Sequence, residues 1–199
     1  FAVIASPVGS YFKGGPAPVS IWVSEHYTPA AIGGTGAVKC GGNYAASLVP
    51  MGEALARGHD QVVFLDAAEH RWIEELGGMN LFFAFADGSL ITPPLSGTIL
   101  PGITRDAILT LARDQGLNVR EEAYSIDQWR EDSASGKLVE TFACGTAAVV
   151  TPVGKVSSHD WEFAIGSGGP GQLTASIRDR LTAIQRGTAP DPHGWVQRV

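Results

Sequence analysis

The stretch that decides the fold is residues 33–44, which read GGTGAVKCGGNY. Lys39 stands in it with glycines on both sides. Glycine adopts positive φ angles and lets the backbone come close to a bound group. A lysine amine in such a loop suits covalent chemistry, because lysines form imines with carbonyl substrates and with pyridoxal phosphate. The alternative is a solvated lysine in a surface loop, which is the commoner situation for a lysine between glycines.

The composition is that of a globular protein. Of the 199 residues, which suffice for one large domain or two small ones, 44% are hydrophobic and 17% are charged. The formal net charge of −6 argues against a general nucleic-acid surface, which needs a basic face. No apolar stretch reaches transmembrane length, so no membrane partner is expected. Cys40 and Cys144 lie far apart and indicate neither a disulfide framework nor a zinc site, which makes the cytoplasm the expected location.

Strands and helices are mixed along the chain without strict alternation, which favours an α+β fold. Apolar runs bounded by turn residues predict strands at 3–6, 19–24, 61–66, 71–77, 80–86, 90–92, 117–123, 138–143 and 147–153. Apolar residues at helical spacing predict helices at 43–57, 103–115, 126–135 and 172–185. Pro50 is expected to break or kink the first of these helices.

Two residues have properties that would serve Lys39 if it carries an imine. Tyr44 follows five positions later, and a nearby phenol can hydrogen-bond the cofactor's ring oxygen and tune the proton affinity of the imine. Glu75 lies in an apolar run next to two glycines, where a carboxylate is costly without a partner. A protonated pyridine nitrogen is such a partner. A simpler interpretation is that Glu74 and Glu75 alternate on a strand, one solvated and the other in a salt bridge.

Two further segments offer backbone N–H groups to an anion. Residues 101–102 precede a predicted helix whose first turn holds Ile103 and Thr104, and helix N-termini bind phosphate groups. The small residues 145–147 lie at a strand break, where free N–H groups and the Thr146 hydroxyl suit a phosphate or a substrate carboxylate. An ordinary helix start and a tight turn between strands explain the same residues.

Together these segments resemble the fold-type IV pyridoxal-phosphate enzymes, and within them the branched-chain amino-acid aminotransferases of the class IV aminotransferase family. The resemblance is carried, in order, by residues 33–44, by 75–80 (ELGGMN), by 100–105 (LPGITR), by 145–147 (GTA), and in the tail by 184–187 (IQRG) and 193–195 (HGW). It implies the large domain of that fold, in which helices flank a mixed β pseudo-barrel.

The resemblance also implies roles for individual residues. Lys39 is expected to form the imine with pyridoxal phosphate and then to move a proton between substrate and cofactor. Tyr44 is expected to bind the cofactor's phenolic oxygen, and Glu75 is expected to pair with its pyridine nitrogen. The phosphate is expected to be held by Ile103, Thr104 and Thr146. The substrate carboxylate is expected to meet the backbone N–H groups of Thr146 and Ala147.

The implied activity is transamination of L-leucine, L-isoleucine and L-valine with 2-oxoglutarate, which gives branched 2-oxo acids and glutamate. The resemblance further implies a homodimer. Relatives of this type are considerably longer and carry an N-terminal small domain, and nothing of that kind precedes Phe1. Residues 1–199 are therefore expected to be the C-terminal cofactor-binding large domain, with weak cofactor binding and no turnover when they stand alone.

Two alternatives stay open. D-amino-acid aminotransferases and aminodeoxychorismate lyases share the lysine and the glutamate, although the lead-in at 33–36 and the long tail ending near Trp195 disfavour both. A non-catalytic module that binds a phosphate-bearing ligand would leave Lys39 with a purely structural role.

Overall fold

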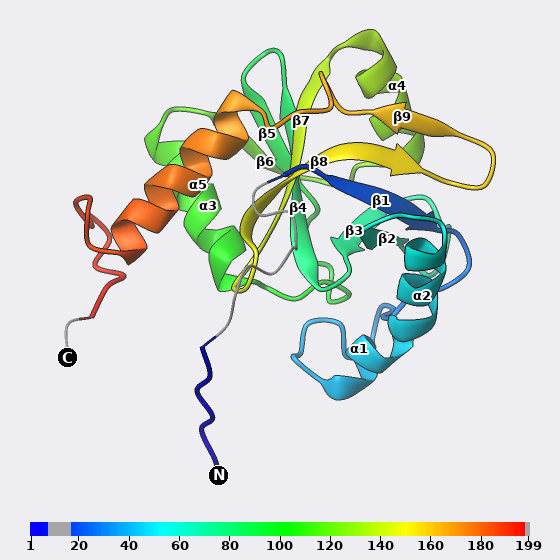
Figure 1. Cartoon of the computed structure of the whole chain (residues 1–199), viewed down its shortest axis with the longest axis horizontal. Coiled ribbons are helices and arrows are strands. Elements are labelled where there is room, and N and C mark those ends of the chain that lie inside the picture. Colours follow the sequence, from blue (N-terminus) through cyan, green and yellow to red (C-terminus); the bar gives the residue numbers. More distant parts are fainter. Residues whose placement is uncertain (8–16, 198–199) are drawn as a thin grey trace.

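The computed structural model describes residues 1–7 and 17–197, in which helices flank one sheet (Figure 1). The elements, in chain order, are β1 (Val19–Ser24), α1 (Gly41–Ala46), α2 (Leu48–Ala56), β2 (Gln61–Leu65), β3 (Ile73–Leu76), β4 (Met79–Phe85), β5 (Ser89–Thr92), α3 (Ile103–Asp114), β6 (Asn118–Glu121), α4 (Ile126–Ser135), β7 (Leu138–Gly145), β8 (Val149–Ser157), β9 (Glu162–Ala164) and α5 (Gln172–Gln185). The α+β architecture predicted from the sequence is confirmed.

Six strands close into a ring in the order β3-β2-β1-β8-β7-β4, because β3 also pairs with β4. Strand β1 runs parallel to β2 and β8, and the other pairs of the ring are antiparallel. One edge of β4 serves two partners: Asn80 pairs with Glu75 of β3, and Phe83 pairs with Ile91 of β5. Strands β5 and β6 therefore extend the sheet beyond the ring. The ring is the mixed pseudo-barrel that the family resemblance implies.

Successive side chains of β1 point to opposite faces of the sheet and pack into separate hydrophobic clusters. Ile21 and Val23 belong to a buried cluster that draws on all six ring strands and on α4, whereas Trp22 faces the opposite way and packs below α2. A further apolar layer lies between the sheet and the helices α3 and α5, where the rings of Phe82 and Phe142 stack at 5.1 Å. In Figure 1, α3 and α5 lie at one side of the molecule and α1 and α2 at the other.

The strand predicted at residues 3–6 is wrong. This segment pairs with no strand in the described part of the chain, and Val3 and Ile4 are 83% and 91% exposed. An apolar run of this length needs a neighbouring strand to complete its backbone hydrogen bonds, and local sequence does not report whether one is present.

The helix predicted over 43–57 is divided into α1 and α2 at Ser47. Pro50 has no N–H to donate to the carbonyl of Ala46, so the hydrogen-bond ladder fails one turn before the proline. The break therefore lies earlier than the proline itself. Strand β3 is shorter than predicted and begins at Ile73, and the three-residue strand β9 is too short for periodicity to reveal. The helices predicted at 103–115, 126–135 and 172–185 are confirmed to within one residue.

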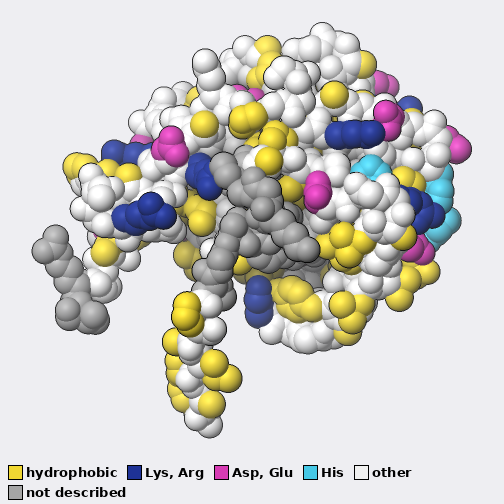
Figure 2. Space-filling model, viewed as in Figure 1, with side chains coloured by type: hydrophobic (Ala, Val, Ile, Leu, Met, Phe, Trp, Pro, Cys, Tyr) yellow, Lys and Arg dark blue, Asp and Glu magenta, His cyan; other side chains and the backbone are white. Residues whose placement is uncertain are grey.

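Apolar side chains also lie at the surface around α1 and α2. Leu48, Val49 and Leu55 are between 57% and 70% exposed, and Figure 2 shows hydrophobic side chains at the surface in this region. Such apolar surface is typical of interaction sites. None of the helices in the described residues combines the length and apolar character that crossing a bilayer requires.

The stacked pair between the sheet and α3 and α5 gives a test of the core. Phe142→Ala removes a ring that is 0% exposed, and we expect it to lower the free energy of unfolding by about 3–5 kcal/mol in urea titrations. Val139→Ala on the same strand, where the side chain is 39% exposed, is the control and should cost less than about 1 kcal/mol. Equal losses in the two variants would contradict this account of the core.

Candidate active site

The loop that carries Lys39 is held by the side chain of Asn43 in α1. Asn43 Nδ2 donates to the carbonyl oxygens of Thr35 at 2.8 Å and Val38 at 3.1 Å, and Asn43 Oδ1 accepts from Thr35 Oγ1 at 2.7 Å. Cys40 N–H closes the turn by donating to Val38 at 2.8 Å. The backbone around Lys39 is thus fixed, although the lysine side chain itself is exposed.

The same loop packs directly on the segment that precedes α3. A Cβ atom at Gly36 would collide with the backbone of Thr98, so only glycine fits this position. Ala37 N–H donates to the carbonyl oxygen of Gly97 at 3.0 Å. At Gly36, therefore, the glycine pattern of the sequence has a direct steric cause.

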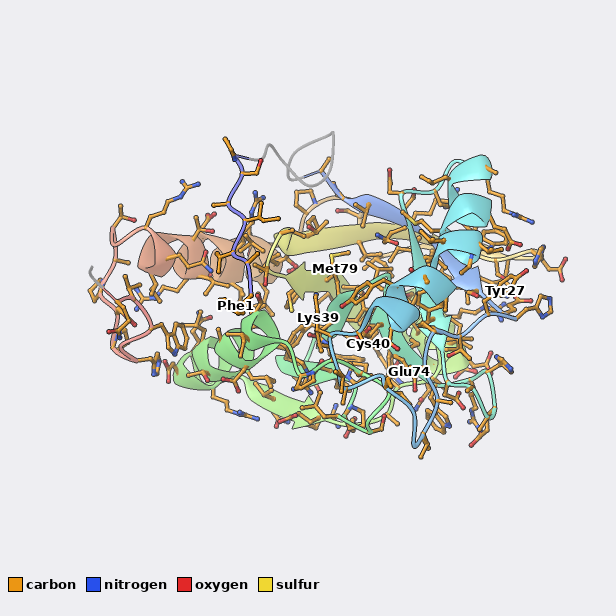
Figure 3. The ribbon with its side chains drawn as sticks, turned by 90° about the horizontal axis from the view of Figure 1, so that it is seen from below. Phe1, Tyr27, Lys39, Cys40, Glu74 and Met79 are labelled. Carbon is orange, nitrogen blue, oxygen red and sulfur yellow. The ribbon has the colours of Figure 1, made fainter. Side chains whose placement is uncertain are left out.

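Lys39 borders a cleft of about 330 Å³, which is also lined by Tyr44, by the β3–β4 turn and by the β7–β8 turn. Lys39 Nζ lies 5.0 Å from the centre of the Tyr44 ring. Gly77 and Gly78 form part of the wall, and Figure 3 shows Lys39 and Met79, another lining residue, in the same region of the molecule. The cleft thus joins a primary amine and a phenol over a wall of glycine backbone.

Glu75 lies in a smaller cleft that adjoins the first, since Tyr44 and Gly77 line both. Glu75 Oε1 accepts the N–H of Leu100 at 2.8 Å. The amine and the carboxyl that the sequence singled out, 36 positions apart in the chain (75 − 39), are therefore close to each other around Tyr44.

Burial raises the pKa of Glu75 from 4.5 to about 7. The hydrogen bond from Leu100 and the charge of Lys39 oppose this rise in the pKa, whereas the neighbouring Glu74 adds to it. Among the described residues, no basic side chain lies within ion-pair distance of Glu75. The carboxyl can therefore hold or release a proton near neutral pH, and it is open to a cationic partner.

The structure contradicts the simpler interpretation of the two glutamates, one solvated and one in a salt bridge. Glu74 is only 8% exposed and accepts a hydrogen bond from Thr98 Oγ1 at 2.5 Å. Neither Glu74 nor Glu75 makes an ion pair within residues 1–7 and 17–197. The strand alternates as expected, but both of its faces are partly or wholly covered.

Ile103 and Thr104 stand at the N-terminus of α3, beside the two clefts and outside their linings. The N-cap, Gly102, makes no side-chain hydrogen bond, so the first N–H groups of the helix have no capping side chain. Asn80 fixes the turn: its Nδ2 donates to Leu100 at 3.1 Å, and a Cβ at Gly102 would collide with its Oδ1. The helix terminus is thereby held next to the start of β4, which borders the larger cleft.

Thr146 and Ala147 belong to the short turn between β7 and β8, and both line the larger cleft. Gly145 pairs with Val149 across this turn. Val149 has φ of 58°, a conformation that is unusual for a β-branched residue and that costs about 1–3 kcal/mol. Such strain is typical of functional sites, and here it gives the turn a defined direction beside the cleft.

The structure thus brings Lys39, Tyr44, Thr146 and Ala147 to one cleft and Glu75 to its neighbour. Sequence reasoning missed the supporting residues Asn43, Glu74 and Asn80. The two asparagines lie inside the motifs quoted above, but only their hydrogen bonds show that Asn43 fixes the lysine loop and that Asn80 fixes the turn before α3. For Glu74 a signal existed, because two adjacent carboxylates on an apolar strand cannot both face water.

Cys40 and Cys144 are both free thiols. Hydrogen bonding, chiefly with Thr35, lowers the pKa of Cys40, whereas burial raises the pKa of Cys144. Within the described ranges there is no group of three or more side chains that could hold a metal ion.

Comparison with known proteins identifies the relatives of this chain. The family model described as "Amino-transferase class IV" matches residues 35–156. A branched-chain-amino-acid aminotransferase of Mycolicibacterium smegmatis is 55% identical over 202 residues, which span 100% of this chain and 55% of that relative. The chain therefore spans about half the length of the curated relatives that it matches.

Solved structures give the same result. The crystal structure of the Escherichia coli branched-chain amino acid aminotransferase superposes with a TM-score of 0.81 at 35% identity, over 97% of this chain and 60% of that one. The branched-chain amino acid aminotransferase of T.th., complexed with N-(5'-phosphopyridoxyl)-L-glutamate, gives a TM-score of 0.76 at 32% identity, over 90% of this chain and 56% of that one. The resemblance inferred from the sequence motifs is confirmed, and the chain belongs to the class IV aminotransferase family.

Proposed function

We propose that this chain is the cofactor-binding large domain of a pyridoxal-phosphate-dependent transaminase. The observation that carries the proposal is the pair of joined clefts, with the amine of Lys39 in one and the carboxyl of Glu75, whose pKa is about 7, in the other. The T.th. relative, complexed with a phosphopyridoxyl compound, supports the choice of cofactor.

The residues present fit pyridoxal phosphate. Gly77 has φ of 62°, and a Cβ at Gly78 would come within 3.0 Å of the Tyr44 ring, so the glycine at position 78 lets the Tyr44 ring pack against the wall of the larger cleft. The phenol is thereby held beside the amine of Lys39. A carboxyl without a fixed cation suits a protonated ring nitrogen, and uncapped N–H groups at the start of α3 suit a phosphate.

Pyridoxal phosphate, when bound, supplies an aldehyde carbon that takes up an amino group and a ring that accepts electrons. In our proposal Lys39 Nζ would hold the cofactor through its aldehyde carbon and would carry a proton from and to the substrate's α-carbon. Glu75 holds the proton on the ring nitrogen through its carboxylate. The Tyr44 hydroxyl hydrogen-bonds the phenolic oxygen of the ring.

The anionic ends of cofactor and substrate go to backbone N–H groups. Ile103 and Thr104 offer theirs at the positive end of the α3 dipole, and Thr146 adds a hydroxyl for the phosphate. The N–H groups of Thr146 and Ala147, on the strained turn, orient the substrate carboxylate. Ile103 and Thr104 lie outside the cleft linings, so the phosphate would lie at the rim between the cleft and α3.

As substrates we propose L-leucine, L-isoleucine and L-valine, with 2-oxoglutarate as the amino acceptor. Support comes from the names of the relatives and from Met51, Val62 and Met79 in the cleft, whose apolar surface suits aliphatic side chains. A homodimer in the cytoplasm completes the proposal, since the exposed apolar surface around α1 and α2 is available to a partner.

The first test is covalent labelling of the lysine. After pyridoxal phosphate and borohydride are added, peptide mass spectrometry should find the reduced cofactor on Lys39 in the wild type and on no lysine in Lys39→Ala. Lys137→Ala, in which an exposed lysine outside the cleft is replaced, is the matched control and should label as the wild type does. A colourless protein without an adduct on Lys39 would favour the non-catalytic alternative.

The second test uses the raised pKa of Glu75 in the cofactor-free protein. Because the folded-state pKa of about 7 lies above the unfolded value near 4.5, stability from this group is fully present below 4.5 and is lost as pH rises through 7. The free energy of unfolding of the wild type, minus that of Glu75→Gln, should therefore fall between pH 5 and pH 8. Glu74 is present in both proteins and its direct contribution largely cancels. A difference that stays constant over this range would show that Glu75 is not shifted.

The third test separates the substrate classes. With 2-oxoglutarate, the complete protein should form glutamate from leucine, isoleucine and valine and should be much slower with D-alanine. Glu75→Gln should lower kcat by about 10²-fold or more, because proton-holding groups contribute on this order. A preference for D-alanine would instead favour the D-amino-acid aminotransferase alternative.

A further inference from the structure

A separate cleft of about 460 Å³ lies against β3, lined by Glu74 rather than Glu75. Successive side chains of a strand point to opposite faces, so the two adjacent glutamates serve different clefts. The walls are mainly apolar and include Ala31, Ile32, Trp72, Pro94 and Ile99. The ionisable side chains among the lining residues are all acidic: Asp66, Glu69 and Glu74.

Of these three acids, Glu74 has an oxygen to spare in a buried position. Asp66 uses both oxygens to accept backbone N–H groups of the turn that follows it, and Glu69 is exposed. Glu74 is 8% exposed; its Oε1 accepts from Thr98 Oγ1, and its Oε2 has no hydrogen-bond partner among the described residues. Glu74 Oε2 is not among the fully buried side-chain atoms that lack a partner, so this oxygen remains accessible to a donor that enters the cleft.

Thr98 links this cleft to the active site. Its hydroxyl donates to Glu74, its backbone packs against Gly36 of the lysine loop, and it also lines the small cleft of Glu75. Two residues later, the N–H of Leu100 donates to Glu75 Oε1. One short segment therefore contacts both carboxyls and the loop that carries the lysine. Figure 3 shows Lys39, Cys40 and Glu74 in this part of the molecule.

We propose that this cleft binds a small apolar ammonium compound. The charged nitrogen pairs with the free oxygen of Glu74, and the hydrocarbon part lies against Trp72, Pro94 and Ile99. The carboxyl of Glu74, in a lining without a basic group, selects a cation, and the apolar walls select its hydrocarbon part. Binding at Glu74 does not depend on the proposed function. Its transmission through Thr98 and Leu100 to Glu75 matters for catalysis only if that function is correct.

The probe is N,N-dimethylisobutylamine, which is an ammonium ion at neutral pH and, as a tertiary amine, cannot condense with an aldehyde in the other cleft. Isothermal titration calorimetry on the cofactor-loaded protein should find saturable binding to one site. Uncharged 3-methylbutan-1-ol, of similar size, should bind at least about tenfold more weakly, since a hydrogen bond to a charged group contributes at least that factor. Equal affinity for the alcohol, or no saturable binding of the amine, would overturn the proposal.

Variants locate the site. Glu74→Gln keeps an acceptor for Thr98 but removes the charge, and it should weaken amine binding about tenfold or more. Glu69→Gln, at the exposed rim, is the matched control and should change the affinity by less than about twofold. Ala31→Phe narrows the cleft without touching Glu74 and should exclude the amine even if Glu74→Gln folds poorly. Unchanged affinity in both Glu74→Gln and Ala31→Phe would show that the amine binds elsewhere.

The link to the active site has its own measurement. In amide NMR spectra the signals of Thr98 and Leu100 should shift on addition of the amine in the wild type and stay in place in Ala31→Phe. If the amide signal of Thr98 shifts and that of Leu100 does not, the effect of the bound amine does not reach Glu75, and this part of the proposal is wrong. The binding measurements can be repeated without cofactor, so a failure to label Lys39 would refute the proposed function and leave this site standing.

Discussion

The site depends on one short segment, residues 97–100, that is held between the lysine loop and strand β3. Gly97 accepts the N–H of Ala37, Thr98 donates to Glu74, and Leu100 donates to Glu75. Within the described residues, the side chain of Asn43 in the short helix α1 also fastens the lysine loop. The amine and the carboxyl come from parts of the chain that do not contact each other through regular secondary structure. Their relative position is therefore set by a few backbone and side-chain hydrogen bonds of this segment.

The ring of strands gives that segment a rigid support. Strand β4 pairs with β7 on one edge, while its other edge is divided between β3 near Asn80 and β5 near Phe83. The segment that leads into α3 is attached at the β3–β4 pair, because Leu100 N–H donates to Glu75 and the Leu100 carbonyl accepts from Asn80. Asn80 stands at this point, where its amide holds Leu100 and its oxygen leaves no room for a side chain at Gly102. The start of α3 is thus attached to the barrel, and its free N–H groups stay beside the cleft.

Much of this could be predicted from local sequence. Helix α4 has the bounds expected because Ser125 and Gln128 form a capping box at its start and Gly136, with φ of 76°, ends it. These signals are local and act within a few residues. The failures arise where distant partners decide the outcome. The segment 3–6 has the pattern of a strand but no strand beside it, and the break before Pro50 follows from a carbonyl four residues earlier. Likewise, motifs named the residues around Lys39, but not that Glu74 is tied to Thr98 across 24 positions.

The two adjacent carboxyls of β3 present an electrostatic problem. Burial in the apolar strand raises the pKa of both Glu74 and Glu75, and the charge of Glu74 raises the pKa of Glu75 further. A chain that needed only the carboxyl of Glu75 could carry an apolar residue at position 74 and avoid the cost of burying a second acid. The cost of the second acid is offset if a cation in the cleft on the Glu74 side of the strand neutralises the charge of Glu74. Because the Glu74 charge raises the pKa of Glu75, a cation that neutralises Glu74 favours the ionised form of Glu75. The strand would then act as a short electrostatic connection between two clefts, with no change in backbone structure required.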